Sequence, residues 1–201
     1  MKKILKTIEK RNSSLSGIIT NEDDNEMRLS GHAAVFNQPT VIFESAGVEF
    51  KEVIDRNAFD ECDISACCLK YNHSDHIPIL SRVRSGNLKI TTDSIGLKFE
   101  TTLFETQTSR DVYSLIKQGG LDSCSFAFTI KEESYNSETH TRTILKIDKL
   151  FDVSIVDFPA YEGTDVSARS YFEAEAEKLK ALESLQKLNR KKNILKLKLH
   201  K

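Results

Sequence analysis

Ser125 begins the segment of the chain best suited to nucleophilic chemistry. Gly119 and Gly120 are expected to end a helix just before it, and the residues that follow alternate as in a β-strand. Phe126 would then face one side of this strand, whereas Ser125 and the small Ala127 would face the other. A hydroxyl fixed on a strand can attack a carbonyl carbon if a base lies within hydrogen-bonding reach.

A candidate base lies about fifty residues earlier, in Leu69–His76, which reads Leu-Lys-Tyr-Asn-His-Ser-Asp-His. His73 comes where a buried strand is expected to run into a loop, a position from which a rigid frame can project a side chain. An imidazole can accept and return a proton near neutral pH. His73 is therefore a candidate base for Ser125, and a structural or merely exposed histidine is the alternative.

Two other kinds of site use neighbouring residues. Cys124 could be the nucleophile of a thiol protease, but on a regular strand it faces away from Ser125 and is more easily explained as a core residue. A zinc ion could be held by Cys67, Cys68, His73 and His76. Adjacent cysteines on a strand converge poorly on one ion, however, and the spacing matches no usual pattern, so we expect no metal and no cofactor.

The overall composition excludes several classes of protein. The chain has 201 residues and a formal net charge of -1, which gives it no general attraction for nucleic acid or for an anionic membrane. No apolar run approaches the roughly 20 residues that cross a bilayer, and the amino end has too short an apolar part for a secretory signal. The four cysteines show no disulfide spacing. These features favour a reduced, cytoplasmic protein.

Hydrophobic periodicity predicts a strand-rich α+β fold with few helices. A helix is expected from about Ser109 to Gln118, with a capping box at Thr108-x-x-Asp111 and a stop at Gly119. We expect these strands to form a small mixed β-barrel or a compact sheet flanked by helices. The predicted strands are 27–35, 48–54, 66–71, 88–92, 97–102, 125–133, 141–147 and 150–158.

The two ends of the chain differ in composition from the centre. Residues 1–25 are polar and predict a mobile arm, and residues 26–169 form the expected domain. Residues 170–201 predict a helical, basic tail with early glutamates and late lysines, which suits the helix dipole. Leucines recur every three residues in this tail, so it could be a surface helix or a segment that binds a partner.

The chain carries five short motifs in a fixed order: Gly31–Phe36, Asn72–Asp75, Pro78–Arg82, Ser125–Phe128 and Phe151–Ala160. Together they resemble the prohead serine proteases of tailed phages, which are distantly related to the herpesvirus assemblins. The resemblance runs from about residue 27 to residue 168. It departs from the family pattern at Ser74, where an aspartate is usual, and at Ala127, where glycine is usual.

The resemblance implies a herpesvirus-protease-like barrel in which Ser125 is the nucleophile and His73 the general base. Asp152 falls where the family carries an acid, and it would orient the imidazole. His140 and Asp157 are the alternatives for this third position. Oxyanion donors could come from the loop through Arg82 or from the turn at Gly119 and Gly120.

The implied function is a serine endopeptidase of capsid maturation, acting in the host cytoplasm inside the assembling procapsid. Its substrates would be the major capsid protein precursor, scaffold segments and its own termini, and it could form a homo-oligomer. A non-catalytic assembly module with the same fold, which binds a shell or scaffold protein, is the alternative.

Overall fold

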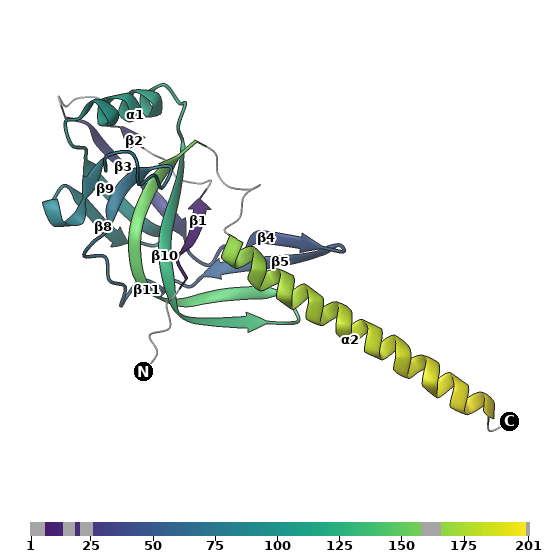
Figure 1. Cartoon of the computed structure of the whole chain (residues 1–201). Coiled ribbons are helices and arrows are strands. Elements are labelled where there is room, and N and C mark those ends of the chain that lie inside the picture. The colour runs from purple at the N-terminus through teal and green to yellow at the C-terminus, as the bar shows by residue number, and fades with distance from the viewer. Residues whose placement is uncertain (1–6, 14–18, 21–25, 158–165, 200–201) are drawn as a thin grey trace.

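The computed structural model describes residues 7–13, 19–20, 26–157 and 166–199, in two β-sheets, two α-helices and one short 3-10 helix (Figure 1). The strands follow in chain order, with the 3-10 helix η1 at Val83–Ser85 after β7 and α1 at Gln107–Lys117 after β9. The strands are β1 (Glu9–Ser13), β2 (Ile19–Thr20), β3 (Arg28–Val35), β4 (Thr40–Ser45), β5 (Val48–Ile54), β6 (Cys68–Tyr71), β7 (Ser81–Arg82), β8 (Leu88–Thr92), β9 (Gly96–Thr102), β10 (Ser123–Asn136) and β11 (Thr141–Val156).

Seven strands form a mixed sheet in the order β1-β10-β11-β5-β4, with β6 paired to β11 and β7 paired to β6. The other four form an antiparallel sheet in the order β2-β3-β9-β8. The hydrogen bonds between these strands therefore form two open sheets. The expected barrel is not closed by the strands that the structure describes, although the larger sheet is mixed as predicted.

The long strand β11 organises the larger sheet. Its first residues pair in parallel with β5, and its last residues, from Asp152 to Ile155, pair in parallel with β6. The sequence predicts two strands here, 141–147 and 150–158, but β11 is continuous because the buried residues Ile147 and Leu150 keep the polar Asp148 and Lys149 within the strand. One element thus links the β5 end of the sheet to the β6 end.

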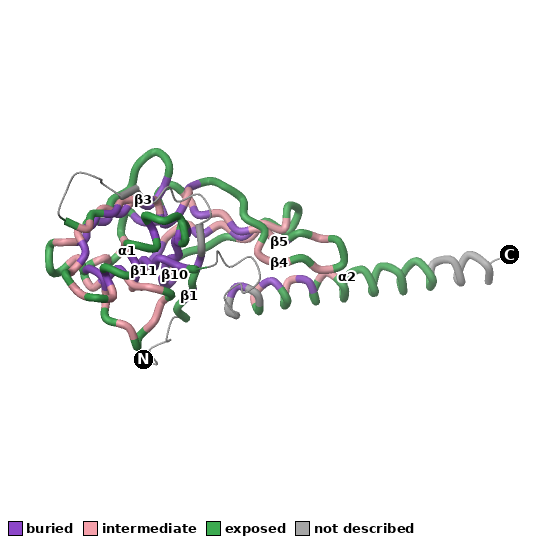
Figure 2. Tube along the Cα trace, turned by 90° about the horizontal axis from the view of Figure 1, so that it is seen from above, coloured by how far each residue is buried: buried purple, intermediate pink, exposed green. Residues whose placement is uncertain are grey.

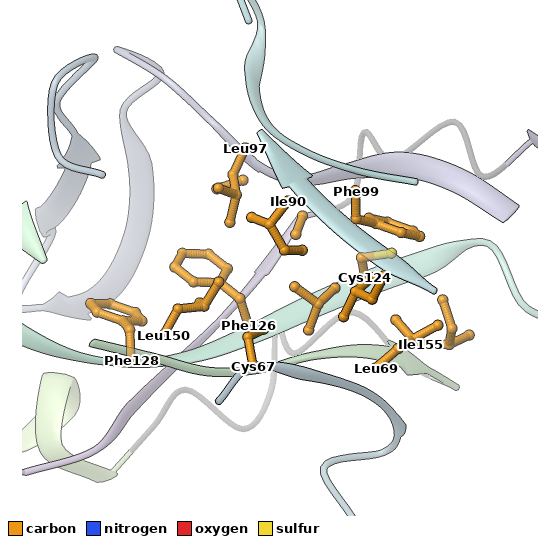
Figure 3. Close-up of a cluster of buried hydrophobic side chains, with 14 of the residues drawn as sticks. Cys67, Leu69, Ile90, Leu97, Phe99, Cys124, Phe126, Phe128, Leu150 and Ile155 are labelled. Carbon is orange, nitrogen blue, oxygen red and sulfur yellow. The ribbon is translucent and has the colours of Figure 1, made fainter. Parts of the chain in front are cut away.

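The hydrophobic core lies between the two sheets (Figure 3). Side chains from β8 and β9, among them Ile90 and Phe99, face Phe126 from β10, and Phe126 stacks on Phe128 with ring centroids 4.9 Å apart. Residues two apart on β10 share this face, as expected from the period of a strand. The opposite face of β10 is consequently left for Ser125 and Ala127.

Helix α1 forms close to its predicted position, but its cap differs. Thr106, and not Thr108, is the N-cap, and its hydroxyl accepts a hydrogen bond from the Ser109 amide at 3.1 Å. Gly119 ends the helix with a φ of 73°, a left-handed conformation that glycine adopts without a steric penalty.

Helix α2 (Val166–Leu199) begins before the predicted tail boundary at residue 170. Its first turns bury Phe172 against Phe50 of β5, with ring centroids 5.8 Å apart. Beyond these turns the helix extends away from the sheets (Figure 1). Most of its residues up to position 192 are exposed (Figure 2), and Leu182 and Leu185 are among them. The tail is thus a docked helix with a long projecting part.

The amino-terminal arm also differs from expectation in the part that the structure describes. Residues Glu9–Ser13 are not a mobile arm but strand β1, paired antiparallel with β10. The prediction missed this strand because its buried residues, Glu9 and Arg11, are charged and give no hydrophobic alternation. The rest of the expected arm lies largely outside the described residues.

Replacing Phe172 with alanine should detach the start of α2 from the body. Truncation of a fully buried phenylalanine to alanine lowers the free energy that stabilises its packing by about 3 kcal/mol or more. Hydrogen exchange should therefore speed up in residues 168–176, with the amides of β10 and β11 unchanged. Leu182→Ala, at an exposed site of the same helix, is the matched control and should alter stability by less than about 0.5 kcal/mol. Equal exchange in the two variants would contradict the docking.

Candidate active site

The turn that carries His73 follows β6 directly. Asn72 and His73 both adopt left-handed backbone conformations, each with a φ of 52°, which is uncommon for residues other than glycine. Asn72 donates from its side-chain amide to Asp157 at 2.7 Å and accepts from the Asp157 amide at 3.1 Å. Tyr71 also donates its hydroxyl to Asp157. Asp157 therefore fixes the turn from which His73 projects.

The imidazole of His73 bridges two groups on neighbouring strands. Its Nε2 lies 2.6 Å from the Oγ of Ser125 on β10, and its Nδ1 lies 2.6 Å from Oδ1 of Asp152 on β11. With the ring proton on Nδ1, the imidazole donates to the carboxylate and accepts from the serine hydroxyl. In that tautomer Nε2 is ready to take the serine proton.

The hydroxyl of Ser154 supports both partners of this bridge. It donates to Oδ1 of Asp152 at 2.8 Å, lies 3.1 Å from Nδ1 of His73, and accepts the His73 backbone amide at 3.2 Å. Sequence reasoning did not single out Ser154. Its signal was the two-residue spacing from Asp152, which puts both side chains on one face of a strand.

Strand pairing brings these side chains onto one face of the sheet. Ser125 is opposite Ser154, and Ala127 is opposite Asp152. Because Ala127 is small, it leaves room for the carboxylate and the imidazole above the strands. Cys124 points to the other face, where it is fully buried in the core (Figure 3).

The site is enclosed. Ser125 has no exposed surface, and the side chains of His73 and Asp152 are 10% and 7% exposed. A strand pairs with β10 on each side of Ser125, with Asn12 of β1 opposite it on one side and Ser154 on the other. Because Ser125 is fully buried, some of the atoms around it must move before a polypeptide can reach its hydroxyl.

A lysine brings positive charge close to Asp152. Burial alone would lower the pKa of Lys70, but its 2.5 Å hydrogen bond to Asp75 and the charge of Asp152 raise that pKa above its ordinary value. Lys70 consequently stays charged, and it adds positive potential on the side of the sheet that carries the carboxylate.

The nearby thiols have the opposite character. Burial raises the pKa of Cys62 to about 12 and also raises the pKa values of Cys67 and Cys68. Thiols that stay protonated are poor nucleophiles. Among the residues that the structure describes, no three His, Cys, Asp or Glu side chains are grouped so as to hold a metal ion. The alternative zinc site is therefore not assembled.

The alternatives for the third position lie elsewhere. Asp157 contacts the turn before His73 and makes no hydrogen bond with the ring. His140 is in the turn between β10 and β11, at the far end of the hairpin from Ser125, where its ring lies 5.3 Å from that of Phe50. Of the three candidates, only Asp152 contacts the His73 ring.

The amides considered as oxyanion donors already have partners. The Arg82 amide donates to the Asn87 side chain at 3.1 Å. The amides of Gly119 and Gly120 donate to carbonyl groups of the last turn of α1, at 3.0 Å and 2.9 Å. Each would have to give up its hydrogen bond before it could stabilise an oxyanion.

A serine, an imidazole and a carboxylate linked in this order are the arrangement used by serine hydrolases. Comparison with protein families assigns the chain more narrowly, because residues 16–179 match the family described as caudovirus prohead serine protease. This match covers most of the sequence, so the chain belongs to that family. Searches of the curated proteins and of the solved structures found no match to this chain. No helix among the described residues is long and apolar enough to span a membrane.

Replacing Asp157 with alanine should loosen the turn that holds His73. The variant loses the two carboxylate contacts, to Tyr71 and to Asn72, that help to stabilise two consecutive left-handed residues, and keeps only the hydrogen bond from its backbone amide to Asn72. Amide exchange at residues 72–74 should increase, and the His73 ring resonances should broaden. Asp75→Ala removes an exposed carboxylate from the same loop and should leave those resonances unchanged. If both variants give the wild-type spectrum, Asp157 does not fix the turn.

Proposed function

We propose that this chain is a serine endopeptidase that cleaves capsid precursor and scaffold proteins during prohead maturation, with Ser125 as its nucleophile. The observation that carries the proposal is the bridge made by His73. One nitrogen of its ring lies 2.6 Å from the Ser125 hydroxyl, and the other lies 2.6 Å from the Asp152 carboxylate. Membership of the prohead serine protease family supports the kind of substrate.

The chemistry follows from this geometry. The Oγ of Ser125 attacks the scissile carbonyl carbon while Nε2 of His73 takes its proton. The imidazolium is stabilised by Asp152 and then protonates the departing amine, which leaves an acyl group on Ser125. Water, deprotonated by the same nitrogen, releases the acyl group and restores the serine. Ser154 holds the carboxylate and the ring in register throughout.

Membership of the family supports the setting of this proposal. The enzyme would act in the host cytoplasm, inside the assembling procapsid, with residues 26–169 and the docked β1 as its protease unit. Its own termini are further substrates, because exposed ends of a chain are where backbone can enter a protease site. Association into a homo-oligomer and the distant kinship with herpesvirus assemblins stay predictions.

A non-catalytic assembly module is the second candidate, and one observation favours it. Leu182, Leu185 and Leu188 are 48–56% exposed on the projecting part of α2, where they could meet a shell or scaffold protein. An assembly module would keep this binding when Ser125 is replaced and would produce no new chain termini.

Incubating the purified chain with the purified shell precursor, followed by mass spectrometry, tests the proposal directly. New termini should appear in the precursor and in the chain itself. Ser125→Ala and His73→Ala should each lower the cleavage rate by about 10⁴-fold or more while leaving the fold intact. Cys124→Ala is the matched control, since it alters the adjacent residue on the other face of β10, and it should keep most of the activity. Cleavage retained by either site variant would remove that residue from its role.

Asp152→Asn should lower kcat by about 10²–10⁴-fold with little change in KM. The amide cannot stabilise the imidazolium, and it favours the wrong tautomer of the ring. Ser154→Ala keeps the carboxylate and should therefore cost less, on the order of tenfold. If Asp152→Asn keeps the wild-type kcat, the carboxylate has no part in the reaction.

A further inference from the structure

Strand β1 occupies the outer edge of β10 at the nucleophile. The antiparallel register runs from Glu9 opposite Phe128 to Ser13 opposite Cys124, so that Asn12 is opposite Ser125. The inner edge of β10 is permanently paired with β11. Extended peptides commonly bind by adding a strand to a sheet edge, where the main chain supplies most of the hydrogen bonds. Here the edge beside Ser125 is already filled.

A buried group of charges holds β1 in place. Arg11 binds the Glu52 carboxylate of β5 with two nitrogens, at 2.5 Å and 2.8 Å. Glu9 accepts two hydrogen bonds from Arg142 of β11, both at 3.1 Å. Burial alone would lower the pKa of Arg11, but the charges of Glu52 and Glu9 raise it above its ordinary value. The strand is thus recognised through an acid and an arginine two residues apart.

The body of the protein can keep its own charges paired without β1. Arg142 already lies 3.3 Å from Glu52 and binds Glu133 at 2.5 Å. Because β1 buries one negative and one positive side chain in this group, Glu9 and Arg11, its departure leaves the net buried charge unchanged. Removing one half of a buried ion pair usually costs stability because it leaves the other charge buried and unpaired. Here Glu52 and Arg142 would still be paired with each other. The edge can therefore exchange one strand for another.

We propose that the outer edge of β10 is a strand-binding site for substrate, and that β1 is a resident strand which an incoming extended polypeptide must displace. Glu52 and Arg142 select segments with an acid and an arginine at two-residue spacing, as in Glu9-Lys10-Arg11. The substrate role rests on the proposed function, whereas the exchange of strands does not.

A labelled peptide with the sequence of residues 7–13 tests the exchange without catalysis. Binding is measured by fluorescence anisotropy on the full chain carrying Ser125→Ala. Adding Arg11→Ala weakens the resident strand, and the peptide should bind about tenfold tighter, which corresponds to about 1.4 kcal/mol of lost β1 docking. Arg28→Ala removes an arginine from an exposed ion pair on β3 and is the matched control. A peptide with its glutamate and arginine exchanged should bind about tenfold more weakly.

A reversible lock provides the second arm. Ser13 and Cys124 are directly opposite each other in the backbone register, and residues opposite one another in an antiparallel pair have a Cα separation that a disulfide can span. Ser13→Cys therefore provides a second thiol for Cys124. After oxidation with oxidised glutathione, with the bond verified by mass spectrometry, the chain should lose peptide binding, and dithiothreitol should restore it. The unsubstituted chain under the same oxidant controls for damage to Cys124.

The outcomes separate the two proposals. If Arg11→Ala and Arg28→Ala bind the peptide equally, or if the locked chain binds it as well as the reduced one, the exchange is overturned. Fluorophosphonate labelling of chains that retain Ser125 reports on the chemistry separately. Tighter peptide binding by Arg11→Ala without any labelling of Ser125 would support the edge site and count against the proposed nucleophile.

Discussion

The register between β10 and β11 is the constraint on which the site depends. It sets Ser125 opposite Ser154 and Ala127 opposite Asp152, and it leaves Cys124 and Phe126 on the core side. A slip of one residue would turn the hydroxyl into the core and bring a thiol to the imidazole. The stacked pair Phe126 and Phe128, buried between the two sheets, resists such a slip. Packing on one face of β10 therefore determines the chemistry on the other.

The parts of the fold that depend on a local sequence pattern could be predicted. Alternation from Ser125 identified the face on which the hydroxyl lies, and the glycine at position 119 identified the end of α1. The grouping of Ser125, His73 and Asp152 came from the resemblance of short motifs, because pairings 52 and 79 residues apart along the chain cannot be derived from one sequence's periodicity. Ser154 was missed since its one signal, the two-residue spacing from Asp152, has a meaning only once Asp152 is placed at the site.

Sequence patterns failed where charge takes the place of hydrophobicity. Strand β1 buries Glu9 and Arg11, whose partners Arg142 and Glu52 lie 133 and 41 residues away in the sequence. A polar segment of this kind resembles a loop until its partners are known. The barrel expectation failed for a related reason: closure depends on which edges pair, and the described strands end in two open sheets. Local preferences do not fix that pairing.

The length of α2 limits what its far end can reach. A helix of 34 residues at the usual rise is about 50 Å long, and its first turns are fastened beside Phe50 and Tyr135, the latter ten residues along β10 from Ser125. The helix then leads away from the sheets (Figure 1). While most of α2 stays helical, a bond near its end cannot reach the Ser125 of its own chain, so the self-cleavage proposed above would need a second copy. Trimming of that end would follow second-order kinetics, slow in dilute solution and fast where many copies are confined in a small volume.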